Sequence, residues 1–135
     1  MSIEIDHLGI AVTSLAEGLR FYEHLLGLSV VHRETVASER VNLAMLPIGS
    51  SATPSRIELL EATDPDSTIA KFIAKRGPGL HHIALRVDDL PAVIQRLKSD
   101  GARLLDEPRS GAGGHTYVFV HPASTGGVLL ELIQK

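Results

Sequence analysis

Two histidines and two glutamates stand at equivalent positions of an internal repeat. His7 and His82 each lie five residues before a valine and are 75 residues apart, whereas Glu58 and Glu131 are 73 residues apart in similar apolar stretches. Imidazole and carboxylate groups together bind divalent first-row metal ions. If the two copies of the repeat pack with pseudo-twofold symmetry, these four side chains meet at one point. The sequence therefore predicts a metal site.

Each of these residues taken alone has a structural explanation. A single histidine on a strand is more often a hydrogen-bonded structural residue, and a single glutamate more often lies on the solvent side of an edge strand. Four matches at repeat-equivalent positions favour the metal site. Glu131 adds to this argument because it lies within the apolar run 129–133, where an unpaired buried carboxylate would be costly.

The ligand types restrict the metal. The chain has no cysteine, so thiolate sites and thiol nucleophiles are excluded. Nitrogen and oxygen ligands favour cobalt or manganese, then nickel, magnesium or iron, over a closed structural zinc site, although zinc remains an alternative. Four protein ligands around an octahedral ion would leave two positions for water or substrate.

The first copy of the repeat has the pattern strand, helix and three strands. Residues 3–12 alternate between apolar and small or polar side chains, which predicts a strand with His7 on one face. Ser14 is a plausible N-cap for a helix that ends near Gly27. Three further strands are predicted over 28–33, 41–46 and 56–60, with a polar loop over 34–40.

The second copy repeats this order after a short helical linker. We expect the linker helix over 69–75, and then the following elements: a strand over 82–87, a helix over 90–100, strands over 104–105, 117–121 and 128–133, and a glycine-bearing loop over 107–114. The predicted fold is α+β, with two βαβββ modules at about residues 3–61 and 79–134 in a single domain spanning 1–135.

Composition excludes several classes of function. With 135 residues and a net charge of −3, the chain has no basic field for nucleic acid or for an anionic membrane. Its first residues show no signal-peptide pattern, and no run of 18 apolar residues occurs. The absence of cysteine fits a reducing compartment. We therefore expect a cytoplasmic protein.

Three stretches resemble a known family. The modules with His7, Glu58, His82 and Glu131 resemble the vicinal oxygen chelate (glyoxalase/bleomycin resistance) superfamily over essentially the whole chain. Within it, the stretches 56–61, 66–84 and 111–132 resemble the methylmalonyl-CoA epimerase family. The resemblance implies a metal-dependent isomerase of propionate metabolism. Such an enzyme interconverts (2R)- and (2S)-methylmalonyl-CoA, a small CoA thioester, through an enolate, and the family suggests a homodimer.

The resemblance also assigns acid-base roles. It implies that Glu131 is both metal ligand and base, and that Asn42 stands where some family members carry a second glutamate. Because an amide cannot exchange a proton in this way, Glu39 and His115 are considered as replacements, although an ordinary loop role is the more frequent one for such residues. The remaining histidines are expected to be structural: His24, His32, His81 and His121.

Two alternatives remain open from the sequence. The first is a lyase of the glyoxalase I type, which would use the same ligand set to stabilise an enediolate. The second is a metal-free binding protein on the same scaffold, such as an antibiotic-sequestering resistance protein. Retention of all four ligand residues argues against this second alternative.

Overall fold

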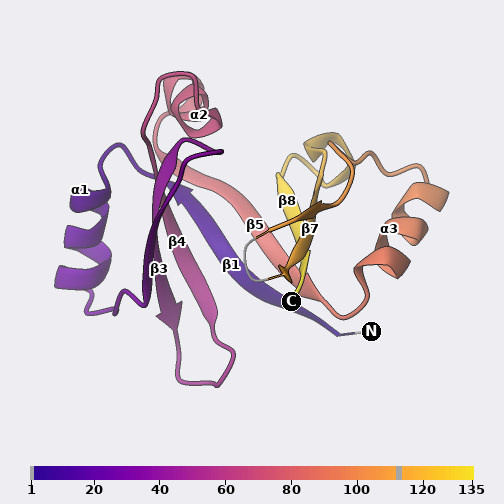
Figure 1. The fold of residues 1–135 in the computed structure, drawn as a ribbon, viewed down its shortest axis with the longest axis horizontal. Helices are drawn as coiled ribbons and strands as arrows, with labels where there is room; N and C mark the ends of the chain where they lie inside the picture. Colours follow the sequence, from indigo (N-terminus) through magenta and orange to yellow (C-terminus); the bar gives the residue numbers. More distant parts are fainter. Residues whose placement is uncertain (1, 112–113) are drawn as a thin grey trace. The chain divides into compact units, whose positions relative to one another are not determined.

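The structure, a computed structural model, describes residues 2–111 and 114–135. The chain forms two compact units: one is His7–His81, and the other joins the segment up to Asp6 to His82–Lys135. Both units combine strands with helices, as the ribbon shows (Figure 1). The predicted α+β class is confirmed.

The unit His7–His81 contains four paired strands in the order β2-β3-β4-β1. Their bounds are β1 (Ile3–Ala11), whose last five residues belong here, β2 (His32–Val36), β3 (Val41–Ile48) and β4 (Ser55–Ala62). β1 runs parallel to β4, whereas β4, β3 and β2 pair antiparallel. In Figure 1, β3 and β4 of this group lie beside α1. Since paired residues carry their side chains on the same face, this register assigns every side chain to a face.

Helices cover the two faces of these strands. On one face, α1 (Leu15–Leu19) packs its buried leucines against Ala44, Leu46, Ile57 and Leu59. On the other face, Ile69 of α2 (Thr68–Arg76) packs against Ala11, Val41 and Leu60. The Ser14 hydroxyl caps α1 by accepting a hydrogen bond from the Glu17 N–H, as predicted for a helix N-terminus.

α1 continues directly into one wide turn. This π-helix, η1 (Arg20–Leu25), is followed at Gly27 by a left-handed conformation, with a φ of 87°, that favours glycine. The predicted helix end at this glycine is therefore confirmed. Among the described residues, no helix combines the length and apolar character needed to cross a lipid bilayer.

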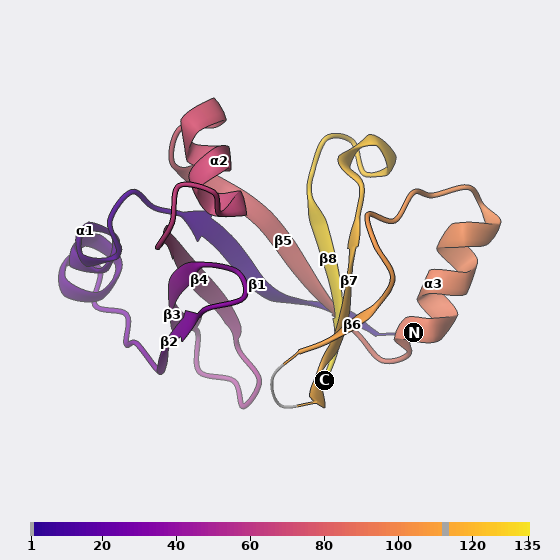
Figure 2. The same cartoon turned by 45° about the horizontal axis from the view of Figure 1, so that its top comes forward.

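The unit with His82–Lys135 repeats the arrangement. Its strand order is β5-β8-β7-β6, with β5 parallel to β8 and the other pairs antiparallel. The elements are β5 (Gly79–Val87), α3 (Leu90–Ser99), β6 (Arg109–Ser110), β7 (Thr116–Val120), η3 (Pro122–Ser124) and β8 (Leu130–Gln134). Figure 2 shows α3 beside this group of strands. Leu90, Val93 and Ile94 of α3 pack on Val118, Val120 and Leu132, which form the core of this unit.

Three predicted segments differ from the structure. The predicted strand over 104–105 is not formed, because Leu104 makes an isolated bridge with Val120 and Leu105 lies in a bend. Residues 28–31 are irregular, and β2 instead begins at His32 and includes Glu34, which was predicted to lie in a polar loop. The reason is that β2 is an edge strand with mostly exposed side chains, so its pairing with β3 is not visible as an apolar run. The predicted loop 107–114 contains β6, and its residues 112–113 lie outside the described residues.

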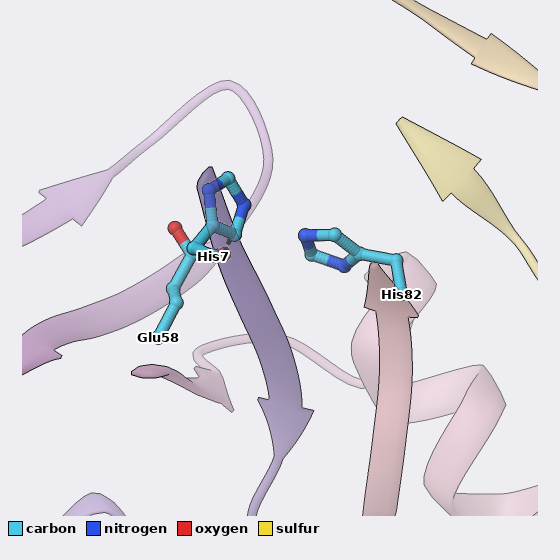
Figure 3. A group of neighbouring side chains, drawn as sticks. All are labelled: His7, Glu58 and His82. Atoms are coloured by element: carbon cyan, nitrogen blue, oxygen red, sulfur yellow. Dashed lines mark ion pairs between the residues drawn. The ribbon is translucent and has the colours of Figure 1, made fainter. Parts of the chain in front are cut away.

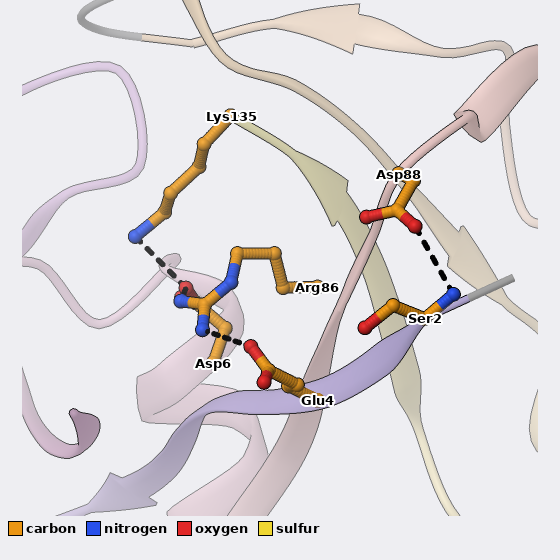
Figure 4. A network of polar contacts seen from close by, with 6 residues as sticks. All are labelled: Ser2, Glu4, Asp6, Arg86, Asp88 and Lys135. Carbon is orange, nitrogen blue, oxygen red and sulfur yellow. Dashed lines mark hydrogen bonds and ion pairs between the residues drawn. The ribbon is translucent and has the colours of Figure 1, made fainter. Parts of the chain in front are cut away.

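A buried carboxylate links the strand ends of the second unit. Asp6 is fully buried, and its Oδ1 lies 3.1 Å from Arg86 Nη1 and 2.8 Å from Lys135 Nζ (Figure 4). Arg86 also donates from Nη2 to Glu4 Oε2 at 2.7 Å. The hydrogen bond to Glu4, together with the charge of Asp6, raises the pKa of Arg86 above its usual value. These contacts tie β1, β5 and the last residue of the chain together.

Replacing Arg86 with alanine is expected to lower the free energy of unfolding by about 2–4 kcal/mol, because the buried Asp6 carboxylate loses a cation that lies 3.1 Å from it. Urea denaturation at neutral pH measures this difference. The matched control is Arg96→Ala on the exposed side of α3, which should change stability by less than about 0.5 kcal/mol. Equal effects of the two substitutions would contradict a stabilising role for the Asp6 network.

Candidate metal centre

A histidine and a glutamate form a buried pair in the unit His7–His81. His7 lies on β1 and Glu58 on the adjacent parallel strand β4, where Glu58 pairs with Gly9. His7 Nε2 is 3.6 Å from Glu58 Oε1, and the two residues are only 5% and 8% exposed. Glycine opposite Glu58 leaves the space beside the imidazole free of a large side chain.

The second unit contains a pair built in the same way. His82 lies on β5 and Glu131 on the parallel strand β8, with His82 Nε2 3.4 Å from Glu131 Oε1. They are 6% and 8% exposed. The ring of Phe119, which pairs with Glu131 across β7 and β8, stands edge-to-face to the His82 ring at 5.9 Å. The repeat seen in the sequence therefore has a structural counterpart in each unit.

The separation of His82 and Glu131 falls within the range expected for two ligands of one ion, and that of His7 and Glu58 is slightly longer. A charge-assisted hydrogen bond between nitrogen and oxygen is about 2.7–2.9 Å long, which is shorter than either separation. Two ligands that share one ion through bonds of about 2.1 Å lie roughly 3.0–3.4 Å apart. A buried carboxylate also favours coordination of a cation. The donor set of each pair is thus suited to a divalent ion.

Three of the four predicted ligands are drawn in Figure 3. His7, Glu58 and His82 are all buried and form a group whose ring nitrogens and carboxylate oxygen could hold a metal ion. The structure therefore contains a candidate metal site of the chemistry expected from the sequence.

The other histidines occupy different surroundings. His81 is packed edge-to-face against the Phe72 ring at a centroid distance of 4.9 Å. His121 accepts a hydrogen bond from the Ala123 N–H and so caps η3, whereas His24 is exposed on η1. His82 rather than His81 joins the candidate ligand group, as the repeat predicted for this pair of neighbouring histidines.

Asn42 does not face the ligand pair of its unit. Asn42 pairs with Glu61, whereas Glu58 pairs with Met45, so Asn42 and Glu58 lie on opposite faces of the strands. The Asn42 amide donates to Glu61 Oε1 at 3.0 Å, and its oxygen accepts from Thr35 Oγ1 at 2.6 Å. The expectation that Asn42 occupies the place of a second proton carrier is corrected by this register.

The two alternative carriers lie outside the paired strands. Glu39 is exposed in the turn between β2 and β3. His115 is half-buried just before β7, and its carbonyl accepts a hydrogen bond from the Gly111 N–H at 2.7 Å. Sequence reasoning missed a different pair, His32 and Glu34 on β2, whose Nε2 and Oε1 atoms are 2.8 Å apart. Their spacing of two residues, which places both on one face of a strand, was the available signal.

Comparison with known proteins identifies the family. Residues 6–119 match the model of the glyoxalase/bleomycin resistance protein/dioxygenase superfamily. The chain belongs to this superfamily. The match covers most of both units, including His7, Glu58 and His82.

Individual relatives belong to one branch of the superfamily. The mitochondrial methylmalonyl-CoA epimerase of Homo sapiens is 35% identical over 96% of this chain and 73% of that protein. An ethylmalonyl-CoA/methylmalonyl-CoA epimerase of Cereibacter sphaeroides is 35% identical over 96% of both chains. The predicted resemblance to methylmalonyl-CoA epimerases is confirmed.

A solved structure agrees with these sequence relatives. It is a Streptomyces coelicolor methylmalonyl-CoA epimerase variant in complex with 2-nitronate-propionyl-CoA, 38% identical to this chain. It superimposes with a TM-score of 0.88 over 97% of this chain and 96% of that chain. The likeness therefore extends over nearly the full length, and the glyoxalase-like fold predicted from the sequence is confirmed.

Proposed function

We propose that this protein is a metal-dependent epimerase that interconverts (2R)- and (2S)-methylmalonyl-CoA through an enolate. The observation that carries the proposal is the pair of buried histidine–glutamate contacts at 3.6 and 3.4 Å, in a chain related to methylmalonyl-CoA epimerases along its full length. The substrate class is a CoA thioester, as in the Streptomyces coelicolor complex. A nucleic-acid or membrane partner is not part of the proposal.

The proposed ligands are His7, Glu58, His82 and Glu131. Cobalt or manganese fits this nitrogen and oxygen set best, with nickel, magnesium, iron or zinc as alternatives. A bound divalent ion supplies Lewis-acid stabilisation of the negative charge that develops on the thioester and carboxylate oxygens when C2 loses its proton. The low exposure of all four side chains excludes bulk water and so strengthens this electrostatic effect.

Glu131 is the proposed base. Its carboxylate accepts the C2 proton from one epimer and returns a proton to the same face of C2 in the reverse direction. Such general acid-base catalysis raises the reaction rate by about 10²- to 10⁴-fold. Glu131 is 8% exposed and pairs with Phe119 across the strands, so an apolar ring borders the carboxylate. This environment keeps water from competing for the proton.

Three further features belong to the same proposal. The two modules act as one domain, the protein forms a homodimer, and it works in the cytoplasm. Several large apolar residues in and after η1 are more than half exposed: Phe21, Leu25, Leu26 and Val31. Such an exposed apolar group supports a surface that binds a partner. Light scattering of the purified protein would exclude the homodimer if it gave the mass of a single chain.

The proposed activity can be separated from its nearest alternative in one assay. Chelator-treated protein receives cobalt or manganese and is given either one pure epimer of methylmalonyl-CoA or the hemithioacetal of methylglyoxal and glutathione. We expect metal-dependent appearance of the other epimer and no turnover of the hemithioacetal. Turnover of the hemithioacetal alone would indicate a lyase of the glyoxalase I type. Absence of bound metal, together with no activation by either ion, would indicate a binding protein.

A further inference from the structure

Epimerisation at C2 requires proton transfer on two faces of one carbon. The C2–H bond breaks as a base takes the proton, and the electron pair moves into the enolate. A new C2–H bond forms when an acid on the opposite face gives its proton to C2. Glu131 can serve one face only, and Asn42 lies away from the ligand face of its unit. A second proton carrier is therefore needed.

The strand register of the unit His7–His81 singles out one side chain. Glu58 lies in a row with Met45 of β3 and His32 of β2, all on one face. The next row on that face contains Leu60, Leu43 and Glu34. Among the paired residues of these strands within this unit, all of which the structure describes, Glu34 is the one carboxylate besides Glu58 on this face. The third, Glu61, lies on the other face with Asn42.

The separation of Glu34 from the ligand pair suits a substrate carbon between them. Two strand spacings of about 4.8 Å place β2 roughly 10 Å from β4. By register, Glu34 and Glu58 stand on the same face at the two ends of this interval. A substrate carbon held between the two strands would thus lie near both Glu34 and the ligand pair.

His32 holds the Glu34 carboxylate and connects it to solvent. Its Nε2 is 2.8 Å from Glu34 Oε1, and the two side chains are 55% and 40% exposed. A carboxylate held by an imidazole at hydrogen-bond distance keeps a defined orientation. Partial exposure allows Glu34 to exchange its proton with water between turnovers, which every cycle of epimerisation requires.

We propose that Glu34 is the second proton carrier of the epimerisation, with His32 as its positioning residue. This inference rests on the proposed function. Glu34 removes the proton of one epimer while protonated Glu131 delivers a proton to the opposite face, and the roles reverse for the other epimer. After each turnover one of the two carboxyl groups has gained a proton and the other has lost one, and exchange with solvent restores both.

The test is Glu34→Gln, with Glu61→Gln as the matched control on the opposite face. Each variant is loaded with cobalt, and its metal content is measured. Pure (2R)- and (2S)-methylmalonyl-CoA are then followed separately in deuterated water. For Glu34→Gln we expect unchanged metal content, epimerisation reduced by about 10²- to 10⁴-fold, and retained deuterium exchange in the one epimer that Glu131 serves. Glu61→Gln should match the wild type.

The outcomes separate this inference from the proposed function. Epimerisation by Glu34→Gln at a rate close to wild type would overturn the role of Glu34 and leave the epimerase proposal intact. Loss of exchange from both epimers together with loss of metal would also overturn it, because the effect would then be structural. A wild-type protein that epimerises neither substrate would remove the proposed function itself.

Discussion

Replacing Glu131 with glutamine should reduce deuterium incorporation at C2 of one methylmalonyl-CoA epimer by about 10²- to 10⁴-fold. The amide oxygen of glutamine can still ligate a metal ion, but the side chain cannot take a proton from carbon. Metal content should therefore remain close to wild type while exchange on one face is lost. Proton NMR of each pure epimer in deuterated water, with cobalt-loaded protein, measures the rate.

The matched control for this substitution is Glu23→Gln on the exposed side of η1, which should leave both exchange rates unchanged. If exchange in Glu131→Gln equals wild type for both epimers, Glu131 is not a base. Glu58 is proposed only as a ligand. Loss of exchange with retained metal in Glu131→Gln would therefore distinguish the role of Glu131 from that of Glu58.

Replacing Glu58 with alanine should weaken metal binding and activity together. Loss of an outer-shell partner already costs about 10- to 100-fold in metal affinity, and loss of a direct ligand should cost at least the upper value. Glu58 is 8% exposed and 3.6 Å from His7, so alanine removes both the ligand and the anionic partner of the imidazole. Calorimetric titration of chelator-treated protein with cobalt measures the affinity.

The control for Glu58→Ala is Glu61→Ala on the same strand. Glu61 faces away from the candidate centre and accepts hydrogen bonds from Asn42 and the Leu15 N–H, so its loss should affect stability and not metal affinity. Full activity with retained metal in Glu58→Ala would exclude Glu58 from the site.

The candidate ligands could be located from the sequence because the repeat places each ligand type at two equivalent positions. One histidine on a strand has many explanations, but His7 and His82 recur with Glu58 and Glu131, and both pairs are buried and close in the structure. The alternation along residues 3–12 also predicted β1, from which Ile10 and the adjoining Val12 pack with the α1 cluster and His7 lies on the other face.

The placement of Asn42 and Glu34 depended on information that one sequence does not contain. Which face a residue occupies relative to Glu58 follows from strand register, and a shift of one residue exchanges the two faces. β2 is an exposed edge strand, so its polar residues resemble a loop. The pairing of Glu34 with Leu43 was therefore visible only after the strands were placed.

The most direct test of the central claim follows the C2 proton of methylmalonyl-CoA in deuterated water. Chelator-treated protein is mixed with the racemic thioester, with and without added cobalt or manganese. We expect the C2 proton signal to disappear in a metal-dependent manner and both epimers to become deuterated. A C2 signal that persists in the metal-loaded sample, under conditions in which the protein binds the ion, would contradict the central claim.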